Sequence, residues 1–337
     1  MIEIFYYRDP QKNFGDDLNE YIWQRVLPAS LLSRDDIILV GIGSILTSER
    51  LEKYVGGPKR VAVVGTGISY GTPPSNMSDW YIAAVRGPFS AAILERPDLG
   101  VTDGAILLAD TTDLVPKSEK QDKILFMPHR SSIDGPELQQ AVEDAGMVYV
   151  SPQQDTLTVL KHYGTAQLVV TEAMHGAIVA DTLRIPWIPV VLNPQVDEFK
   201  WRDWARSMSV EYQPVEIPFP TLDSRLRFSA YKGNLRKSGI VGHRSLEGDQ
   251  TPQALKGYLN HRFGSSQNIW YIDEKTKLLR RVAGKVRRFT DPMTIKSCTR
   301  ALNVVKAKNP FLSPDRVFDM RLEQMRDAIG RTSEHFA

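Results

Sequence analysis

Short apolar runs alternate with amphipathic stretches through most of the first 210 residues of the chain. Two of these runs, residues 36–43 and 60–67, consist mainly of Ile, Leu, Val, Ala and Gly. Successive strand–helix–strand units produce this alternation, because their parallel strands are covered on both faces by the connecting helices. The pattern predicts an α/β protein built on largely parallel sheets.

The predicted strands form two groups, separated by a polar, proline-containing segment at 111–123 that is typical of a linker. The first group comprises residues 2–7, 36–43, 60–67, 81–87 and 104–110. The second comprises residues 124–129, 147–152, 167–172 and 187–192, with helices expected at 134–145, 155–163 and 174–183. A chain of 337 residues with 42% apolar side chains buries two modest cores more easily than one large core. We therefore expect two Rossmann-like domains, 1–115 and 122–220, that face each other across a cleft.

Residues 221–337 form a different kind of sequence, which we expect to be a basic and largely helical extension. Whether this extension packs back on the first domain is left open. Between 275 and 308 the chain has eleven Lys or Arg residues and one acidic residue, Asp291. Such a segment suits an anionic membrane surface or a solvated helix face, whereas its few aromatic residues argue against nucleic acid as a partner. A last helix is expected with Ser313 as its N-cap and Pro314 as its first residue.

Several classes of protein are disfavoured by the sequence. No apolar run approaches the roughly 20 residues that span a bilayer, and the N-terminal MIEIFYY is typical of a first strand and not of a signal peptide. The single cysteine, Cys298, excludes an internal disulfide and a thiolate metal cluster. We therefore expect a cytoplasmic protein. Any association with the cell membrane is expected to be peripheral, at its inner face. No metal is expected.

Two glycine motifs follow predicted strands, VGIGSIL at 40–46 and VGTGISYG at 64–71. Glycines at these places allow a backbone to approach a ligand or a helix closely. Neither motif is followed by an acidic residue about 20 positions later, as a dinucleotide site requires. We therefore expect no nicotinamide cofactor, and no other cofactor is predicted.

Cationic side chains are expected at the carboxyl ends of two predicted strands. Arg86 follows one in AVRGPFS, and His129 and Arg130 follow another in FMPHRSS. A guanidinium at such a place can bind a carboxylate or a phosphate through two parallel hydrogen bonds. The alternative for Arg86 is an ion pair with a nearby acidic residue.

The segment TEAMHGAIVAD, residues 171–181, connects a predicted strand to a predicted helix. It sets His175 and Gly176 at the start of that helix, where an imidazole and the free backbone amides can bind the same anion. The alternative for His175 is a structural histidine that closes a turn. Glu172, three residues earlier, is either a second functional acid or a helix cap.

Two further segments have polar or aromatic residues of interest. NFGDDLN places Asn13, Gly15 and Asp16 just after the first strand, where they can bind an anion or simply turn the chain. Trp201 and Trp204 lie on one face of a predicted helix, as core residues or as a platform for a sugar.

Taken in order, NFGDDLN, VGIGSIL, VGTGIS, AVRGPFS, VTDGAILLAD, FMPHR and TEAMHGAIVAD followed by IPWIPV resemble the polysaccharide pyruvyl transferases over about residues 3–210. The resemblance implies a fold similar to the B-type glycosyltransferases, phosphoenolpyruvate as donor, and a sugar acceptor that is usually lipid-linked. The product would be a ketal of pyruvate. One departure concerns the loop after the predicted Arg86 helix, where Thr102, Asp103 and Gly104 stand in place of the common Gly-Asp-Pro.

The resemblance also implies roles for individual residues, with the first domain on the acceptor side and the second on the donor side. Phosphoenolpyruvate would contact Arg86, His129, Arg130, His175 and Gly176. Catalytic groups would be His175, Asp16, Asp103 and Glu172, and the acceptor would contact Asn13, Gly15, Asp16 and Gly43. A nucleotide-sugar-dependent glycosyltransferase of the same fold and a non-enzymatic glycan-binding subunit stay as alternatives.

Overall fold

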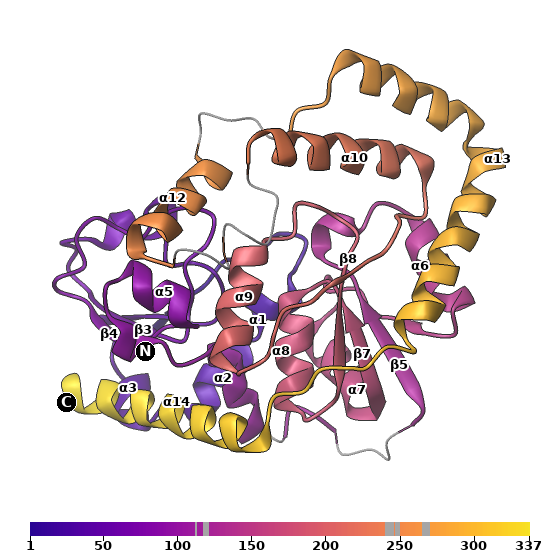
Figure 1. Ribbon diagram of the computed structural model, residues 1–337. Coiled ribbons are helices and arrows are strands. Elements are labelled where there is room, and N and C mark those ends of the chain that lie inside the picture. The colour runs from indigo at the N-terminus through magenta and orange to yellow at the C-terminus, as the bar shows by residue number, and fades with distance from the viewer. Residues whose placement is uncertain (112, 117–120, 240–245, 247–249, 265–269) are drawn as a thin grey trace.

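The computed structural model describes residues 1–111, 113–116, 121–239, 246, 250–264 and 270–337. Its strands form two separate parallel sheets, one from each half of the first 220 residues (Figure 1). The first sheet has the order β1-β2-β3-β4, with bounds Glu3–Phe5, Ile37–Val40, Arg60–Val64 and Tyr81–Ala84. The second has the order β6-β5-β7-β8-β9. Its strands are β5 Lys123–Met127, β6 Val148–Tyr149, β7 Ala166–Thr171, β8 Trp187–Val191 and β9 Val215–Glu216. The predicted α/β class with parallel sheets is therefore confirmed.

Short helices connect the strands of the first sheet or follow its last strand. These are α1 Phe14–Asp17, α2 Asn19–Val26, α3 Ala29–Leu32, α4 Ser48–Leu51 and α5 Pro88–Ile93, with 3₁₀ helices at Glu52–Tyr54 and Pro97–Leu99. The second sheet is connected by α6 Pro136–Asp144, α7 Thr156–Thr165, α8 Met174–Thr182 and α9 Glu198–Ser207, with a 3₁₀ helix at Arg130–Ser132. All four residues of β2 are buried, as expected for a parallel strand that is covered on both faces.

Residues 104–110 were predicted as a strand, and that prediction is wrong. The segment Gly104–Asp110 is a 3₁₀ helix whose first turn is capped by Asp103, because its Oδ1 accepts a hydrogen bond from the amide of Ala105 at 3.0 Å. A short apolar run fits a buried strand or a buried helix equally well, and the cap decides between them here. The 3₁₀ helix packs against α2, α8 and α14, so it joins elements from both halves of the chain.

The largest cluster of buried apolar side chains also includes both halves. It contains Trp23 and Leu39 from the first half and Val169 and Trp187 from the second. Residues 112 and 117–120 of the predicted linker lie outside the described residues.

The last third of the chain is helical where it is described, with α10 Leu222–Lys237, α12 Pro252–Phe263, α13 Glu274–Val305 and α14 Asp315–His335. Helix α13 packs against α10 and α6, whereas α12 packs on α5 and α14 packs on β3 and β4 of the first sheet. In Figure 1, α14 accordingly runs along the lower edge of the first half. None of the helices in the described ranges combines the length and the apolar character that a transmembrane span needs.

The start of α14 differs from the prediction by one residue. Pro314, not Ser313, is the N-cap, and the helix begins at Asp315. The Ser313 hydroxyl is used elsewhere, since it donates to Oδ2 of buried Asp181 at 2.5 Å. The other carboxylate oxygen of Asp181 accepts from the Ser313 amide at 2.8 Å and from the indole Nε1 of Trp187 at 3.0 Å.

We expect Asp181→Ala to lower the free energy of unfolding by about 3 kcal/mol or more, because it leaves three buried donors unpaired. Urea denaturation followed by circular dichroism measures this change. The matched control is Asp315→Ala. Asp181 and Asp315 both form an ion pair with Arg184, but the Asp315 side chain is 88% exposed, and exposed pairs contribute little. Equal effects of the two substitutions would contradict this role of Asp181.

Candidate active site

A cavity of about 540 Å³ lies where loops that follow strands of the two sheets meet, a size usual for small-molecule sites. A smaller hollow shares six of its residues, Asn13, His129, Arg130, Met174, His175 and Lys200. The residues that line the larger cavity alone are Tyr7, Asp16, Ser44, Ile45, Arg50, Tyr70, Ser131, Gln195, Phe263 and Trp270. In the described part of the chain, no group of three or more His, Cys, Asp or Glu side chains is arranged to hold a metal ion.

The position of this cavity follows from the strand order of the second sheet. The chain forms β5, adds β6 on one side and then continues with β7 on the other side of β5. Open parallel sheets bind their ligands at such a switch point, outside the carboxyl ends of the two strands. Residues His129 and Arg130 follow β5, and His175 follows β7. Three of the predicted ligand-binding side chains, His129, Arg130 and His175, therefore line one cavity.

The turn between β7 and α8 sets His175 in the first turn of the helix. The Thr171 hydroxyl accepts from the amide of Ala173, the N-cap residue, at 3.0 Å and closes this turn. Gly176 leaves room for the hydroxyl, because an added Cβ would lie 2.3 Å from the Thr171 Oγ1. The amides at the start of α8 thus lie beside the imidazole of His175, and such a helix terminus favours an anion.

His175 contacts two residues of the first half of the chain. Its Nε2 lies 3.7 Å from Oδ2 of Asp103, and the His175 side chain is 13% exposed while the Asp103 side chain is fully buried. The ring also lies against Gly15, where an added Cβ would come within 2.0 Å of Nδ1. Asp103 therefore reaches the site through His175, and Gly15 is the residue that permits this close contact.

Glu172 lies behind the cavity, fully buried, and does not line it. Its carboxylate accepts hydrogen bonds from the amides of His129, Leu192 and Asn193 at 3.1, 2.7 and 2.8 Å. Burial raises the pKa of Glu172, while these hydrogen bonds oppose that rise. The residue thus ties together the segments that follow β5, β7 and β8.

His129 and Arg130 line the cavity, but only the arginine is cationic near neutral pH. Burial, followed by the charges of Lys200 and Arg130, lowers the pKa of His129 to about 3. The His129 Nδ1 accepts from the Ser131 amide at 3.3 Å, which leaves the proton on Nε2. The Arg130 Nη1 lies 2.5 Å from Oδ2 of Asp9 and its side chain is 37% exposed. The expectation that both residues are cation-capable is corrected for His129, which is a neutral donor.

Asp16 is a buried acidic residue that lines the larger cavity. Asn13 donates its side-chain amide to the Asp16 Oδ2 at 2.5 Å. Burial raises the pKa of Asp16, and the nearby His175 partly offsets the rise. Gly43 lies behind Asp16 with φ of 125°, a conformation that favours glycine, and an added Cβ would lie 2.9 Å from the Asp16 Oδ1. Gly43 therefore leaves room for the Asp16 carboxylate, and it does not itself line the cavity.

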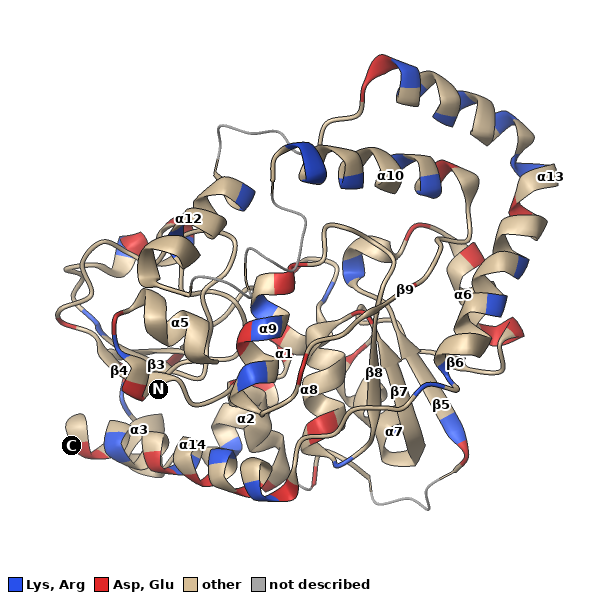
Figure 2. Ribbon diagram, viewed as in Figure 1, with Lys and Arg blue, Asp and Glu red and all other residues tan. Residues whose placement is uncertain are grey.

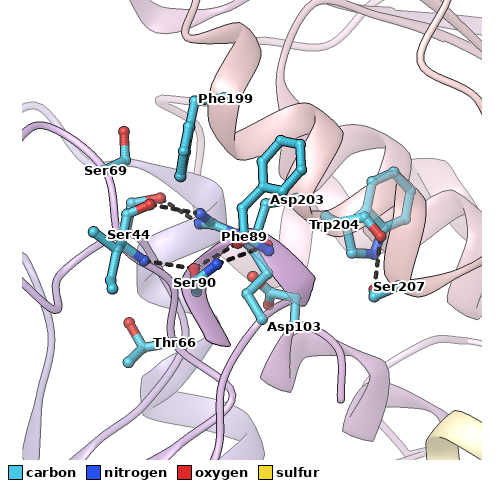
Figure 3. A network of polar contacts seen from close by, with 12 residues as sticks. Ser44, Thr66, Ser69, Phe89, Ser90, Asp103, Phe199, Asp203, Trp204 and Ser207 are labelled. Carbon is cyan, nitrogen blue, oxygen red and sulfur yellow. Dashed lines mark hydrogen bonds and ion pairs between the residues drawn. The ribbon is translucent and has the colours of Figure 1, made fainter. Parts of the chain in front are cut away.

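Arg86, in contrast, does not reach the cavity. Its side chain is 0% exposed and its Nε lies 3.2 Å from Oδ2 of Asp203, which is also fully buried. Asp203 in turn accepts from the amides of Phe89 and Ser90, at the start of α5, at 2.8 and 3.2 Å (Figure 3). Arg86 touches the site only indirectly, because its Nη1 donates to the hydroxyl of cavity-lining Ser44 at 2.5 Å. Arg86 therefore forms an ion pair with an acidic residue, which was the alternative prediction. The prediction that it contacts the ligand is wrong.

Helix α9 adds a residue that sequence analysis missed. Lys200, in its first turn, lines both hollows and donates to the hydroxyl of Tyr70 at 2.9 Å. The available signal was its position shortly after the strand β8, where ligand-binding residues of parallel sheets gather. Trp201 and Trp204 on the same helix are buried against Trp187, so of the two alternatives for this pair the structure has core packing.

We expect Asp16→Asn to stabilise the protein in a pH-dependent way. Because burial raises the pKa of Asp16, the folded state binds its proton more readily than the unfolded chain does. Wild-type stability therefore falls as the pH rises above about 3.9, the usual pKa of aspartate, and through the folded pKa. The uncharged variant should melt at a higher temperature at about pH 8, and the difference should shrink toward about pH 4.

Thermal melts across this pH range test the prediction, with exposed Asp319→Asn as the control. A variant that is no more stable than wild type at about pH 8, or a gain that does not change with pH, would show that burial of the Asp16 charge carries no such cost.

Comparison with known proteins identifies a family for this chain. The family model described as polysaccharide pyruvyl transferase matches residues 3–194. The succinoglycan biosynthesis protein ExoV of Rhizobium meliloti (strain 1021) is 37% identical over 225 residues, which cover 64% of this chain and 68% of that protein. No solved structure matches. With more than half of its length matched by the family model, the chain belongs to the polysaccharide pyruvyl transferase family.

Proposed function

We propose that the protein transfers pyruvate from phosphoenolpyruvate to two hydroxyls of one sugar in an exopolysaccharide repeat unit, with release of phosphate. Membership of the family supports pyruvyl transfer, and the similarity to a succinoglycan biosynthesis protein supports an exopolysaccharide acceptor. The choice of donor rests on one observation: Arg130, His175, Lys200 and the start of α8 meet at the cavity beside the carboxyl ends of β5 and β7. A small dianion that also carries a carboxylate needs such a set of groups.

The phosphate of the donor is assigned to the amides at the start of α8, together with His175 and Lys200. The carboxylate is assigned to Arg130, whose guanidinium is held by Asp9. Neutral His129 adds a hydrogen-bond donor through Nε2. Gly176 contributes close packing at the start of α8.

The chemistry needs groups that remove two hydroxyl protons and deliver one proton to carbon and one to the leaving phosphate. The methylene carbon of phosphoenolpyruvate takes up a proton, a sugar hydroxyl adds to the neighbouring carbon, the phosphate leaves and a second hydroxyl closes the ketal. The two hydroxyl protons balance the proton gained by carbon and the proton carried away with phosphate. His175 is the proposed acid on the leaving oxygen, and its Nε2 lies 3.7 Å from the Asp103 carboxylate.

Asp16 is the proposed base. It lines the larger cavity, whereas Asp103 and Glu172 do not, and its raised pKa makes it a better proton acceptor than an ordinary aspartate. Of the other predicted acceptor contacts, Asn13 and Gly43 lie beside this carboxylate, whereas Gly15 lies against the ring of His175. We further propose that the two sheets form the two halves of a fold similar to the B-type glycosyltransferases, with the acceptor on the side of the first sheet.

We expect His175→Ala to reduce kcat for phosphate release from phosphoenolpyruvate by about 10²–10⁴-fold. Lys200→Ala and Arg130→Ala should mainly raise KM for phosphoenolpyruvate, by about tenfold or more, because each removes a charge-assisted contact. Phosphate release in the presence of candidate acceptor oligosaccharides is the measurement. The control is Arg96→Ala, whose side chain is 58% exposed and pairs with Asp98. Near-normal turnover of the His175 variant, or release of a nucleoside diphosphate from nucleotide sugars, would count against the proposal.

We also propose that α13 holds the enzyme against an anionic lipid surface, where a lipid-linked acceptor would be found. Four apolar side chains of this helix are exposed, Leu278, Val282, Phe289 and Met293. The first two and the last two each stand four residues apart, so each pair lies on one side of its part of the helix. Phe289 and Met293 are the most exposed of these, at 67% and 74%. Lys and Arg residues recur along the same helix (Figure 2). Apolar side chains flanked by basic ones are typical of helices that lie in the membrane interface.

The double variant Phe289→Ser, Met293→Ser should float poorly with vesicles that contain phosphatidylglycerol, because it removes the apolar contact while keeping every charge. Wild type should float with these vesicles at low salt, less so at high salt, and not with pure phosphatidylcholine. Met320→Ser on α14, which removes a 44% exposed methionine, is the control. Wild-type binding that is absent, or indifferent to salt and to lipid charge, would rule out this role of α13.

A further inference from the structure

The cavity has two chemically different parts. The smaller hollow and the wall that it shares with the larger cavity contain the groups assigned to the donor, among them His129, Arg130, His175 and Lys200. The wall that belongs to the larger cavity alone contains four aromatic side chains, from Tyr7, Tyr70, Phe263 and Trp270. Phosphoenolpyruvate has no ring that can stack on these aromatic side chains.

The aromatic side chains come from distant parts of the chain and are held in place. The rings of Tyr70 and Phe263 meet edge to face with centroids 5.1 Å apart. Beside Phe263, the buried Arg262 donates to the carbonyl groups of Pro194 and Val196 at 3.2 and 3.0 Å, which fixes the end of α12. The C-terminal third therefore completes a wall of the cavity.

Tyr70 has an unusual backbone conformation. Its φ is 62°, in the left-handed region that non-glycine residues rarely occupy. Its side chain is also at the surface, since the residue is 37% exposed. Strained backbone persists where the surroundings hold it and is concentrated at ligand-binding sites. Here the hydrogen bond from Lys200 and the contact with Phe263 hold the ring of Tyr70 at the cavity wall.

We infer that Tyr70, Phe263 and Trp270 form a subsite for a pyranose ring of the acceptor. A pyranose has apolar C–H faces and a polar edge, so it stacks on flat aromatic side chains while its hydroxyls bind polar groups. The larger cavity supplies these groups as Ser44, Arg50 and Gln195. This inference rests on the proposed function and deepens it, because it assigns the acceptor sugar to a wall that includes the C-terminal third. Asp16 lines the same larger cavity, within reach of that sugar.

The test is binding to an array of glucose-, galactose- and mannose-terminated oligosaccharides. We expect wild type to bind at least one of these classes and Tyr70→Ala to bind it about tenfold more weakly, the usual loss when an aromatic contact is removed. Tyr70→Phe keeps the ring and its contact with Phe263 but loses the hydrogen bond from Lys200, so it should bind more tightly than Tyr70→Ala. Phe263→Leu keeps apolar volume, loses the flat ring and should bind several-fold more weakly. Tyr271→Ala is the matched control, because Tyr271 is 51% exposed and does not line the cavity.

Melting temperatures of all variants show whether they are folded, and phosphate release from phosphoenolpyruvate is measured on the same samples. Glycan binding without phosphate release would contradict the proposed function and leave the subsite standing. Acceptor-dependent phosphate release with an unchanged acceptor KM in Tyr70→Ala would overturn the subsite and leave the function standing. Absence of wild-type binding to every glycan, or binding of UDP or GDP that Tyr70→Ala abolishes, would also overturn the subsite.

Discussion

The geometry of the site depends on the buried carboxylate of Glu172. It accepts hydrogen bonds from the backbone amides of His129, Leu192 and Asn193. These bonds fix the relative positions of the segments that follow three strands of the second sheet. Those segments carry His129 and Arg130 directly, and they lead to His175 and to Lys200 on the adjoining helices. Hydrogen bonds to a charged group contribute about 1.5–3 kcal/mol each, enough to hold a cluster of cationic and donor groups close together before any anion is bound.

A second buried acidic residue connects this cluster to the first sheet. Asp203 binds Arg86 and the first amides of α5, so helix α9 is fastened to the other half of the chain by a fully buried ion pair. Buried pairs of this kind are costly to break, because the remaining charge is left without a partner. The same contact orients Ser44 toward the cavity and explains why Arg86, although it follows a strand, is a positioning residue and not a ligand.

Much of this arrangement was predictable from the sequence, because its signals are local. Apolar runs gave eight of the nine predicted strands, and the His175 turn follows from a strand joined directly to a helix. The failures have long-range causes. The partner of Arg86 lies 117 residues away, and residues 104–110 adopt a 3₁₀ helix through a cap and tertiary packing that an apolar run does not reveal. Lys200, Phe263 and Trp270 belong to segments whose place at the cavity depends on how distant elements pack.

In the proposed reaction, the cavity between the two sheets brings phosphoenolpyruvate and a sugar together. This reaction is tested most directly by incubating the enzyme with phosphoenolpyruvate labelled at its enol carbon and a mixture of lipid-linked oligosaccharides, and by following the label by carbon NMR. We expect the label to appear as a ketal carbon bonded to two sugar oxygens, in equal amount to the phosphate released, and we expect His175→Ala to abolish this signal. Label that stays in phosphoenolpyruvate or appears only as free pyruvate would contradict it.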